Sequence, residues 1–305
     1  MKPKKNKSEL KKNPFHFQEW NGDEDRLELK NKKLIIIPPG VFKLEGLKWL
    51  SLSQNLLDEL SPDLGTLINL KTLRIFGNYL SVLPPEIGRL VNLSVLDLGK
   101  NKIIQICPEI SQLTGLKELS LQWNLLTEIP ECIGDLTNLT NLSLSINKLS
   151  SLPESFGKLT NLKILDLSHN HFNFFPPQIA KLTAINYLNL VGNDCPSICS
   201  EISSLTNLKE FNLQFNQLKS IPNEICQLSE NLKILKLKKN NIKNLPSDIG
   251  SLKNLSELHL SSNHLIELPR TIKNLSNLTI LRADENGFIY LPPELGILKK
   301  KNQKK

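Results

Sequence analysis

The chain has 305 residues, a hydrophobic fraction of 39%, a charged fraction of 22% and a net charge of +8. This composition suits a soluble globular protein. The sequence has no run of about eighteen apolar residues that would cross a membrane. Its cationic start also lacks the apolar run of about seven or more residues that a signal peptide needs. We therefore expect a cytoplasmic protein with no membrane partner.

The positive charge is concentrated in the two ends of the chain. Residues 1–12 contain six Lys and one Glu, and residues 299–305 contain five Lys and no acid. Without these residues, 27 basic and 29 acidic residues remain, a net charge of −2. A nucleic-acid-binding protein needs a basic stripe on its folded surface, whereas Lys-rich ends are more often solubilising tails. We therefore expect no nucleic-acid partner.

Residues 1–26 hold the basic tail and an aromatic cluster of Phe15, Phe17 and Trp20, which directly precedes the first segment of alternating apolar residues. If that segment begins a stacked array, the core of its first layer is open and needs a cover. We interpret residues 1–26 as a basic tail and N-terminal cap. A short docking motif is the alternative interpretation of the aromatic cluster.

An asparagine-centred phrase recurs through residues 27–298. The asparagine has apolar residues five and three positions before it and two after it, as in Leu96-Asp97-Leu98-Gly99-Lys100-Asn101-Lys102-Ile103. A degenerate first copy has Lys32 at the asparagine position, so the chain contains twelve units. Successive asparagines are 23 residues apart, with one step of 24 caused by Glu230. They are Asn55, Asn78, Asn101, Asn124, Asn147, Asn170, Asn193, Asn216, Asn240, Asn263 and Asn286.

Each unit predicts a short strand, a turn and an irregular or short-helical return. The Leu-x-Leu alternation places both leucines on one face of a strand, and stacked copies pair as a parallel sheet that shares one core. The asparagine amide has the donors and the acceptor that backbone groups at the turn need, so we expect a structural ladder of these amides. Proline six positions later, as at Pro84, ends the strand. Glycine ten positions later, as at Gly88, is expected to allow a tight return.

These features resemble the leucine-rich repeat, in the 23-residue subclass with Leu-Pro in the second half; Ras-suppressor, Scribble and Erbin-type proteins and bacterial repeat arrays are similar. The resemblance covers residues 27–298. It implies an α/β solenoid, a horseshoe of about twelve coils with a parallel β-sheet on the concave face and an irregular or short-helical convex face. Residues 299–305 are then a Lys-rich C-terminal tail. Because this repeat hosts many roles, the resemblance names no partner.

The five cysteines fit neither a zinc nor a disulfide framework. Cys107 and Cys199 stand at proline positions, Cys195 replaces a core leucine, and Cys226 replaces a glycine. The Cys-x-x-x-Cys spacing of 195 and 199 raises the alternative of redox or metal chemistry, but no His or second pair completes a tetrahedral set. We expect free thiols, no metal and no cofactor.

No group of residues in the sequence predicts catalysis. There is no Gly-rich phosphate loop and no nucleophile in a recognisable elbow. His169 and His171 flank a ladder asparagine, and strand spacing of ~5 Å would bring His171 near Asp194 of the next unit. We interpret His171 and Asp194 as an exposed His–Asp pair rather than a metal or acid–base site. We therefore expect that the protein is not an enzyme.

The column directly before the ladder asparagines contains large side chains in the middle of the array. Trp123, Ile146 and His169 are consecutive in it, and Phe215 follows after Gly192. The neighbouring outward columns are small and polar, so this strip resembles a hot-spot row with a polar rim. The alternative is that the rings only shield the ladder. We predict partner contact by Trp49, Phe76, Tyr79, Trp123, Ile146, His169, Tyr187 and Phe215.

The sequence therefore predicts a protein–protein interaction module. We expect a monomeric cytoplasmic scaffold or adaptor that binds a partner protein on its concave face. The alternative is an exported bacterial protein that binds a host or surface partner, and cell fractionation would separate the two.

Overall fold

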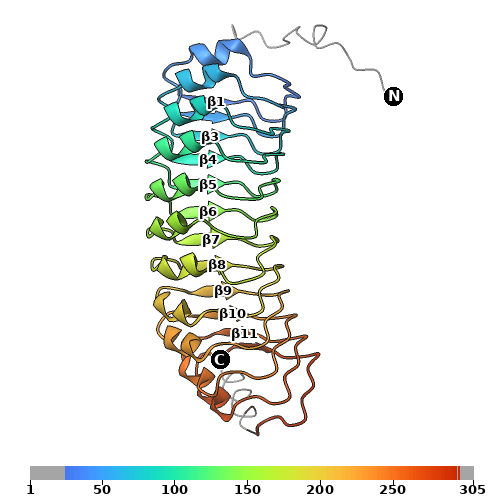
Figure 1. Cartoon of the computed structure of the whole chain (residues 1–305). Helices are drawn as coiled ribbons and strands as arrows, with labels where there is room; N and C mark the ends of the chain where they lie inside the picture. The colour runs from blue at the N-terminus through green and yellow to red at the C-terminus, as the bar shows by residue number, and fades with distance from the viewer. Residues whose placement is uncertain (1–24, 294, 296–305) are drawn as a thin grey trace, which may run out of the picture.

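Twelve short strands form one parallel sheet along the array (Figure 1). The structure is a computed structural model that describes residues 25–293 and 295. Sheet neighbours are consecutive in the chain, so the twelve predicted units are confirmed as twelve stacked coils. Paired residues are 23 positions apart, as for Leu96 and Leu119, and 24 apart between β9 and β10. The strands are β1 (Arg26–Glu28), β2 (Trp49–Ser51), β3 (Thr72–Arg74), β4 (Val95–Asp97), β5 (Glu118–Ser120), β6 (Asn141–Ser143), β7 (Ile164–Asp166), β8 (Tyr187–Asn189), β9 (Glu210–Asn212), β10 (Ile234–Lys236), β11 (Glu257–His259) and β12 (Ile280–Arg282).

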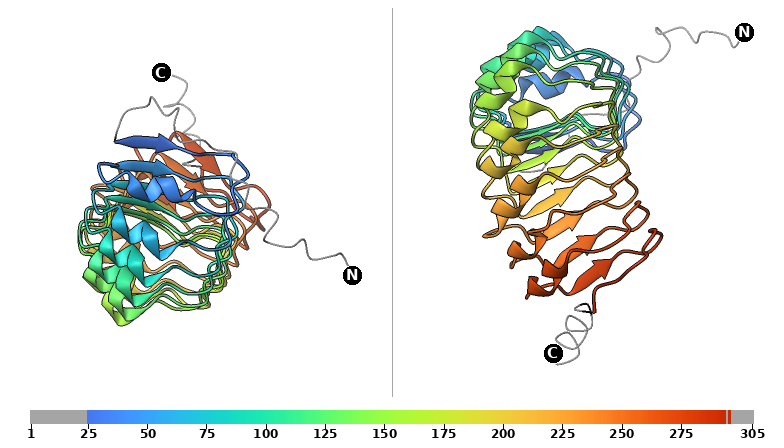
Figure 2. Two further views of the ribbon diagram at one scale, coloured as in Figure 1. Left: turned by 90° about the horizontal axis from the view of Figure 1, so that it is seen from above. Right: turned by 60° about the horizontal axis from the view of Figure 1, so that its bottom comes forward.

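The return half of each of the first eleven coils contains a short 3-10 helix, and these helices stack in a column of their own, so that the coils form an open solenoid (Figure 2). The residue before each helix except η12 is extended, as at Pro84 with φ −71° and ψ 146°, and it is often a proline, because proline cannot continue a strand but fits the start of a helix. The helices are η3 (Pro39–Lys43), η4 (Pro62–Thr66), η5 (Pro85–Arg89), η6 (Pro108–Gln112), η7 (Glu131–Asp135), η8 (Glu154–Lys158), η9 (Pro177–Lys181), η10 (Ser200–Ser204), η11 (Asn223–Leu228), η12 (Ile249–Ser251) and η13 (Arg270–Asn274).

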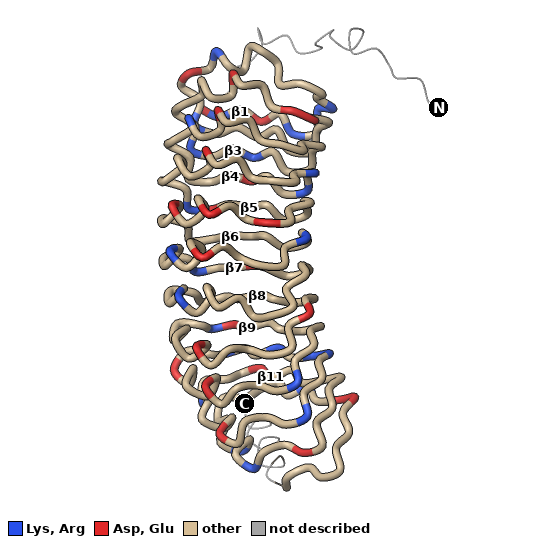
Figure 3. Tube along the Cα trace, viewed as in Figure 1, with Lys and Arg blue, Asp and Glu red and all other residues tan. Residues whose placement is uncertain are grey.

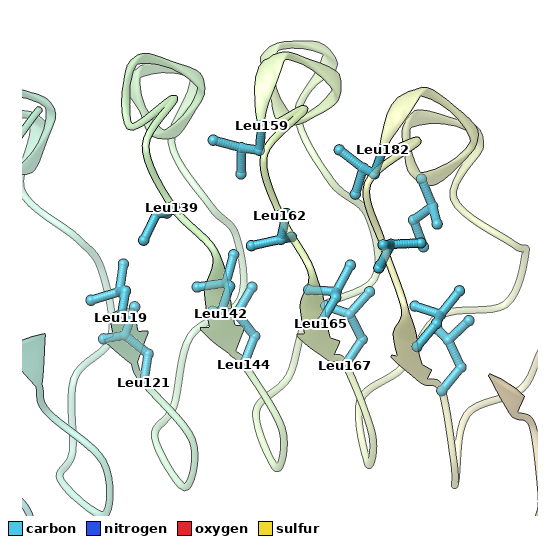
Figure 4. Packing of buried hydrophobic residues seen from close by; sticks show 14 of the residues in the cluster. Leu119, Leu121, Leu139, Leu142, Leu144, Leu159, Leu162, Leu165, Leu167 and Leu182 are labelled. Atoms are coloured by element: carbon cyan, nitrogen blue, oxygen red, sulfur yellow. The ribbon is translucent and has the colours of Figure 1, made fainter. Parts of the chain in front are cut away.

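The core is continuous from coil to coil because each leucine position stacks on the same position of the next coil (Figure 4). Leu142 and Leu144, five and three residues before Asn147, are both 1% exposed. Both therefore point inward, as the alternation predicts. Cys195 is fully buried at a leucine position, which fits its small apolar character.

The ladder asparagines tie adjacent coils together, and all of them except the last, Asn286, are buried. Asn124 Nδ2 donates to the carbonyl of Leu121 in its own coil at 3.0 Å and to that of Leu98 in the preceding coil at 3.1 Å. The Leu98 carbonyl also accepts from Asn101 at 2.9 Å, so each such carbonyl serves two amides. The predicted ladder is confirmed, and it satisfies turn groups that would otherwise be buried without partners.

The glycines in the returns have a different role from the predicted one. They lie in the 3-10 helices, and no positive φ occurs at them. A Cβ atom at Gly88 would instead lie 2.7 Å from the carbonyl oxygen of Glu109 in the next helix, and one at Gly134 would lie 2.5 Å from that of Ser155. These glycines therefore let adjacent helices pack closely, and the expectation that the backbone freedom of glycine makes the return tight was wrong.

The coil with the extra residue is wider at its return. Cys226 stands at the glycine position, and η11 extends over six residues. A cavity of ≈ 500 Å³ opens there, between η11 and the two following returns. Glu230 is exposed after η11, so the insertion is on the outside of the array, where it costs least.

Some sequence-based expectations fall outside the described residues. The proposed cap residues Phe15, Phe17 and Trp20 and the tail of residues 299–305 belong to this group. Within residues 25–293, no helix is long and apolar enough to cross a membrane.

Candidate functional site

The surface above the strands consists of four parallel columns of side chains. Three sheet-face columns lie six, four and two residues before the ladder asparagines, where the side chains alternate with the buried leucines. The fourth, which we call the edge column, consists of the residues directly before the asparagines. The eight predicted contact residues fall on these columns, except Tyr79, which follows its asparagine.

The whole edge column from residue 54 to residue 285 has a left-handed backbone, with φ between 53° and 70°. Only Gly77 and Gly192 are glycines. For another residue this conformation costs roughly 1–2 kcal/mol, and for a β-branched residue such as Ile146 it is especially unusual. The eleven residues are Gln54, Gly77, Lys100, Trp123, Ile146, His169, Gly192, Phe215, Lys239, Ser262 and Glu285.

Hydrogen bonds to both neighbouring coils hold the edge column in this conformation. The N–H of Trp123 donates to the carbonyl of Ser145 in the next coil at 2.9 Å, and its carbonyl accepts from the N–H of Asn101 in the preceding coil at 3.1 Å. Ile146 repeats the arrangement with Ser168 at 2.8 Å and Asn124 at 3.2 Å. The strained backbone is therefore imposed by the stacking.

The predicted mid-array row has two large exposed ends and a more sheltered middle. Trp123 is 54% exposed and Phe215 is 47% exposed, whereas Ile146 is half-buried. His169 is exposed and lies over the next coil, because a Cβ atom at Gly192 would be 2.5 Å from its Nδ1. At a strand spacing of ~4.8 Å the row extends over roughly 19 Å.

The floor beside this row is polar, with small side chains and a few acids. Tyr187 is half-buried, and burial, followed by the charges of Asp166 and Glu210, raises the pKa of its hydroxyl. Tyr187 therefore stays a neutral donor. The carboxylate of Glu210 pairs with Lys236 at 2.6 Å, while Asp166 accepts the N–H of Ser168 at 2.9 Å.

The remaining predicted residues lie toward the front of the array, apart from the row. The guanidinium of Arg26 lies 3.7 Å from the ring centroid of Trp49. Phe76 packs against Gly99 of the next coil, where a Cβ atom would be 2.9 Å from its ring. Tyr79 is capped by Lys102, whose Nζ is 4.7 Å from the ring centroid. Trp49 and Phe76 line one cavity of ≈ 350 Å³.

No metal-binding arrangement occurs within residues 25–293, where no three His, Cys, Asp or Glu side chains cluster. The expected pairing of His171 with Asp194 was wrong, since the described ion pairs do not include it. His259 Nε2 instead contacts Glu257 Oε2 at 3.1 Å. Figure 3 shows that acidic and basic residues are interspersed over the described coils.

Comparison with known families agrees with this geometry. A model of the "Leucine-rich repeat region" matches residues 41–144 and 107–231, which together span more than half of the chain. The chain is a leucine-rich-repeat protein. A second model, "Leucine Rich Repeat", matches residues 254–275 of the same array.

Solved leucine-rich-repeat structures are similar over most of the chain. A leucine-rich-repeat protein from Leptospira interrogans is 33% identical, with a TM-score of 0.68, and the match covers 92% of this chain and 82% of that one. A TDR receptor is 32% identical with a TM-score of 0.79, over 87% of this chain and 48% of the receptor. The Arabidopsis receptor kinase HAESA was solved with the peptide hormone IDA and the co-receptor SERK1. It is 26% identical with a TM-score of 0.64, and the match covers 87% of this chain and 54% of HAESA.

The chain therefore spans about half the length of each of these two receptor chains. No curated protein matches it significantly. Leucine-rich-repeat proteins are in general binding modules, because the stacked coils present a long continuous surface. This leucine-rich-repeat fold is accordingly that of a protein-interaction module.

Two features of the leucine-rich-repeat surface were missed from the sequence. The first is the left-handed backbone of the edge column. Gly77 and Gly192 in that column were a signal for it, because glycine adopts positive φ readily. The other is the contact of Arg26 with Trp49, which joins two coils 23 residues apart. Its signal was the constant spacing, since residues 23 positions apart become neighbours.

Proposed function

We propose that the chain binds a protein partner across its sheet face, with Trp123, Ile146, His169 and Phe215 as the contact row. The observation that carries this proposal is the presence of large side chains on a left-handed backbone. Glycine or asparagine would occupy these positions with less strain. Because the stacking imposes this conformation on the whole edge column, the row is distinguished by the size of its side chains, and Trp123 and Phe215 are both about half exposed.

The chemistry around the row supports a protein partner. Trp123 and Phe215 each present a large ring to solvent, and aromatic residues dominate binding energy at interfaces. The floor beside them carries Ser143, Asn189 and other short polar side chains, which leave room for a partner and form a polar rim. A row of roughly 19 Å would contact about six residues of an extended segment.

We further propose that the protein is a cytoplasmic scaffold or adaptor and not an enzyme. All five cysteines are free, which suits a reducing compartment. The alternative is an exported protein with a peptide or protein partner, and its support is the similarity to HAESA, which was solved with a peptide hormone. Cell fractionation tests the location: recovery in the cytosolic fraction is expected, and recovery in the medium or at the cell surface would favour the alternative.

Photo-crosslinking tests the docking surface. A benzoylphenylalanine placed at Phe215 keeps an aromatic ring in the row, and one placed at Ile68 is a matched control, since Ile68 is 52% exposed and follows η4 away from the sheet face. We expect a crosslinked partner from position 215 and none from position 68. Equal crosslinking from both positions, or crosslinking from 68 alone, would contradict the proposed surface.

A further inference from the structure

A separate cavity lies at the front of the sheet face, over strands β1 to β4. Trp49 and Phe76 line its sides, and its volume of ≈ 350 Å³ is in the range of cavities that hold one or two side chains or a small ligand. Ser51 and Ser53, which are 3% and 7% exposed, also line it. We call this cavity the front pocket.

The front pocket is rich in cationic side chains, and the charge of one of them, Arg74, acts on the carboxylate of Asp97. Arg26 lies against Trp49, and Arg74 and Lys30 are exposed. None of the three cations forms an ion pair within residues 25–293. An arginine stacked on a ring keeps its planar donors available for a carboxylate.

The front pocket has fewer carboxylates than cations, and one of the carboxylates already accepts a backbone hydrogen bond. Asp97 accepts the N–H of Gly99 at 3.1 Å, and burial raises the pKa of its carboxyl. Glu28 supplies the second carboxylate. Three cations therefore face two carboxylates, which leaves a net charge of +1 in the pocket. The negative charge of a carboxylate on the partner would balance it.

We propose that the front pocket is a second subsite that takes the carboxylate of an acidic side chain from the partner. The carboxylate is held by Arg74, Arg26 and Lys30, and an apolar residue next to it packs between Trp49 and Phe76. The inference rests on the proposed function, because the occupant is a segment of the same partner. That segment continues along the sheet face from the contact row, since β2 and β5 are three coils or ~14 Å apart.

Fluorescence polarisation with three labelled nine-residue peptides tests this subsite on the full chain. The first peptide carries Phe followed by Glu-Glu at its centre and has an amidated C-terminus. The second replaces Glu-Glu with Gln-Gln. The third is the Gln-Gln peptide with a free C-terminal carboxylate, which distinguishes a chain terminus from an acidic side chain. We expect the Glu-Glu peptide to bind about tenfold tighter than either of the others, as charge-assisted hydrogen bonds predict.

Two double variants assign the preference to the pocket. K30Q/R74Q should reduce the preference for Glu-Glu over Gln-Gln to less than about twofold. K219Q/K243Q, which removes two exposed Lys that lie outside the sheet-face and edge columns and far from the pocket, is the matched control and should keep the preference. Both variants should melt as the wild type does, because all four substituted residues are exposed and make no described ion pair.

Several results would overturn the subsite. Equal affinity for the Glu-Glu and Gln-Gln peptides, tightest binding of the free-terminus peptide, no saturable binding of any peptide, or an unchanged preference in K30Q/R74Q would each do so. Failure of the contact row would give a different result from failure of this subsite. In that case W123A/F215A would bind the partner as the wild type does, and the front pocket would still prefer the Glu-Glu peptide over the Gln-Gln peptide.

Discussion

The side-chain oxygen of Asn124 accepts the backbone N–H of Ile103 at 2.9 Å, although Ile103 belongs to the preceding coil, 21 residues earlier. The same amide donates to one carbonyl in its own coil and one in the preceding coil. One side chain thus satisfies three buried backbone groups across a coil boundary. Asn101 and Asn147 repeat the pattern, so the ladder fixes both the turn and the spacing of the coils.

Replacing Asn124 with Ala should destabilise the array by roughly 2–4 kcal/mol. The N–H of Ile103 is left buried and unpaired, and two carbonyls each lose one of their two donors. Asn138→Ala is the matched control, since Asn138 makes one exposed bond to the carbonyl of Thr114 at 2.9 Å and should cost less than about 1 kcal/mol. Urea unfolding followed by circular dichroism measures both, and equal losses would show that the ladder amide has no special role.

Gly192 and His169 should be energetically coupled. Gly77→Ala should cost about 1 kcal/mol through backbone strain alone, since φ is +70° and a Cβ atom would meet Gln54 at an ordinary 3.5 Å. Gly192→Ala should cost more, because the Cβ atom would also displace the His169 ring. Adding His169→Ala should recover the excess, with a coupling of about 0.5 kcal/mol or more in a double-mutant cycle. If the free-energy changes of the two substitutions were strictly additive, the His169 ring would not lie against Gly192.

The five thiols should react slowly in the folded protein. Burial raises the pKa of Cys195 to about 12, and its Sγ lies 3.3 Å from the carbonyl of Phe174. Burial also raises the pKa of Cys107 and Cys226. Because the thiolate is the reactive form, Cys195 should resist alkylation at pH 8 until denaturant is added, and its rate should rise with pH up to about 12.

Mass spectrometry after alkylation in denaturant should then find five modified cysteines without prior reduction. A stoichiometric disulfide, or fast labelling of Cys195 in the native protein, would count against both the burial of this thiol and the reducing compartment.

Much of the array could be predicted because its signal is repeated twelve times. The spacing of 23 residues fixed which leucines stack, and the buried Leu142 and Leu144 follow from alternation alone. The glycines in the returns were misread, because the constraint at Gly88 comes from Glu109 of the next coil rather than from its own backbone. Contacts of this kind depend on how closely the coils approach, which periodicity does not specify.

The candidate site was predictable only in part, for a similar reason. The column of Trp123 and Phe215 could be read from the repeat, whereas the backbone strain beneath it arises from hydrogen bonds to both neighbouring coils. The front pocket depends on Arg26 stacking on Trp49, and long side chains have many rotamers that sequence spacing leaves open.

The ends of the array provide another prediction. Deleting residues 2–12 should leave the melting temperature unchanged, because this segment is Lys-rich and has almost no apolar residues to bury. The triple substitution of Phe15, Phe17 and Trp20 by Ala should lower it by several degrees and promote aggregation, since these residues are expected to cover the first coil. Unchanged melting and monodispersity of the triple variant would show that they form no cap.

Affinity of the purified partner for the W123A and F215A variants is the most direct test of the edge column as the docking row. The partner is identified by affinity purification with wild-type protein, and its Kd is then measured for each variant. The control variant I68A/V91A removes two apolar side chains that are 52% and 51% exposed away from the sheet face. We predict a loss of at least ~2 kcal/mol for each edge-column variant, roughly thirtyfold in Kd, with unchanged melting and no loss for the control. Wild-type affinity of both W123A and F215A would contradict the proposed docking row.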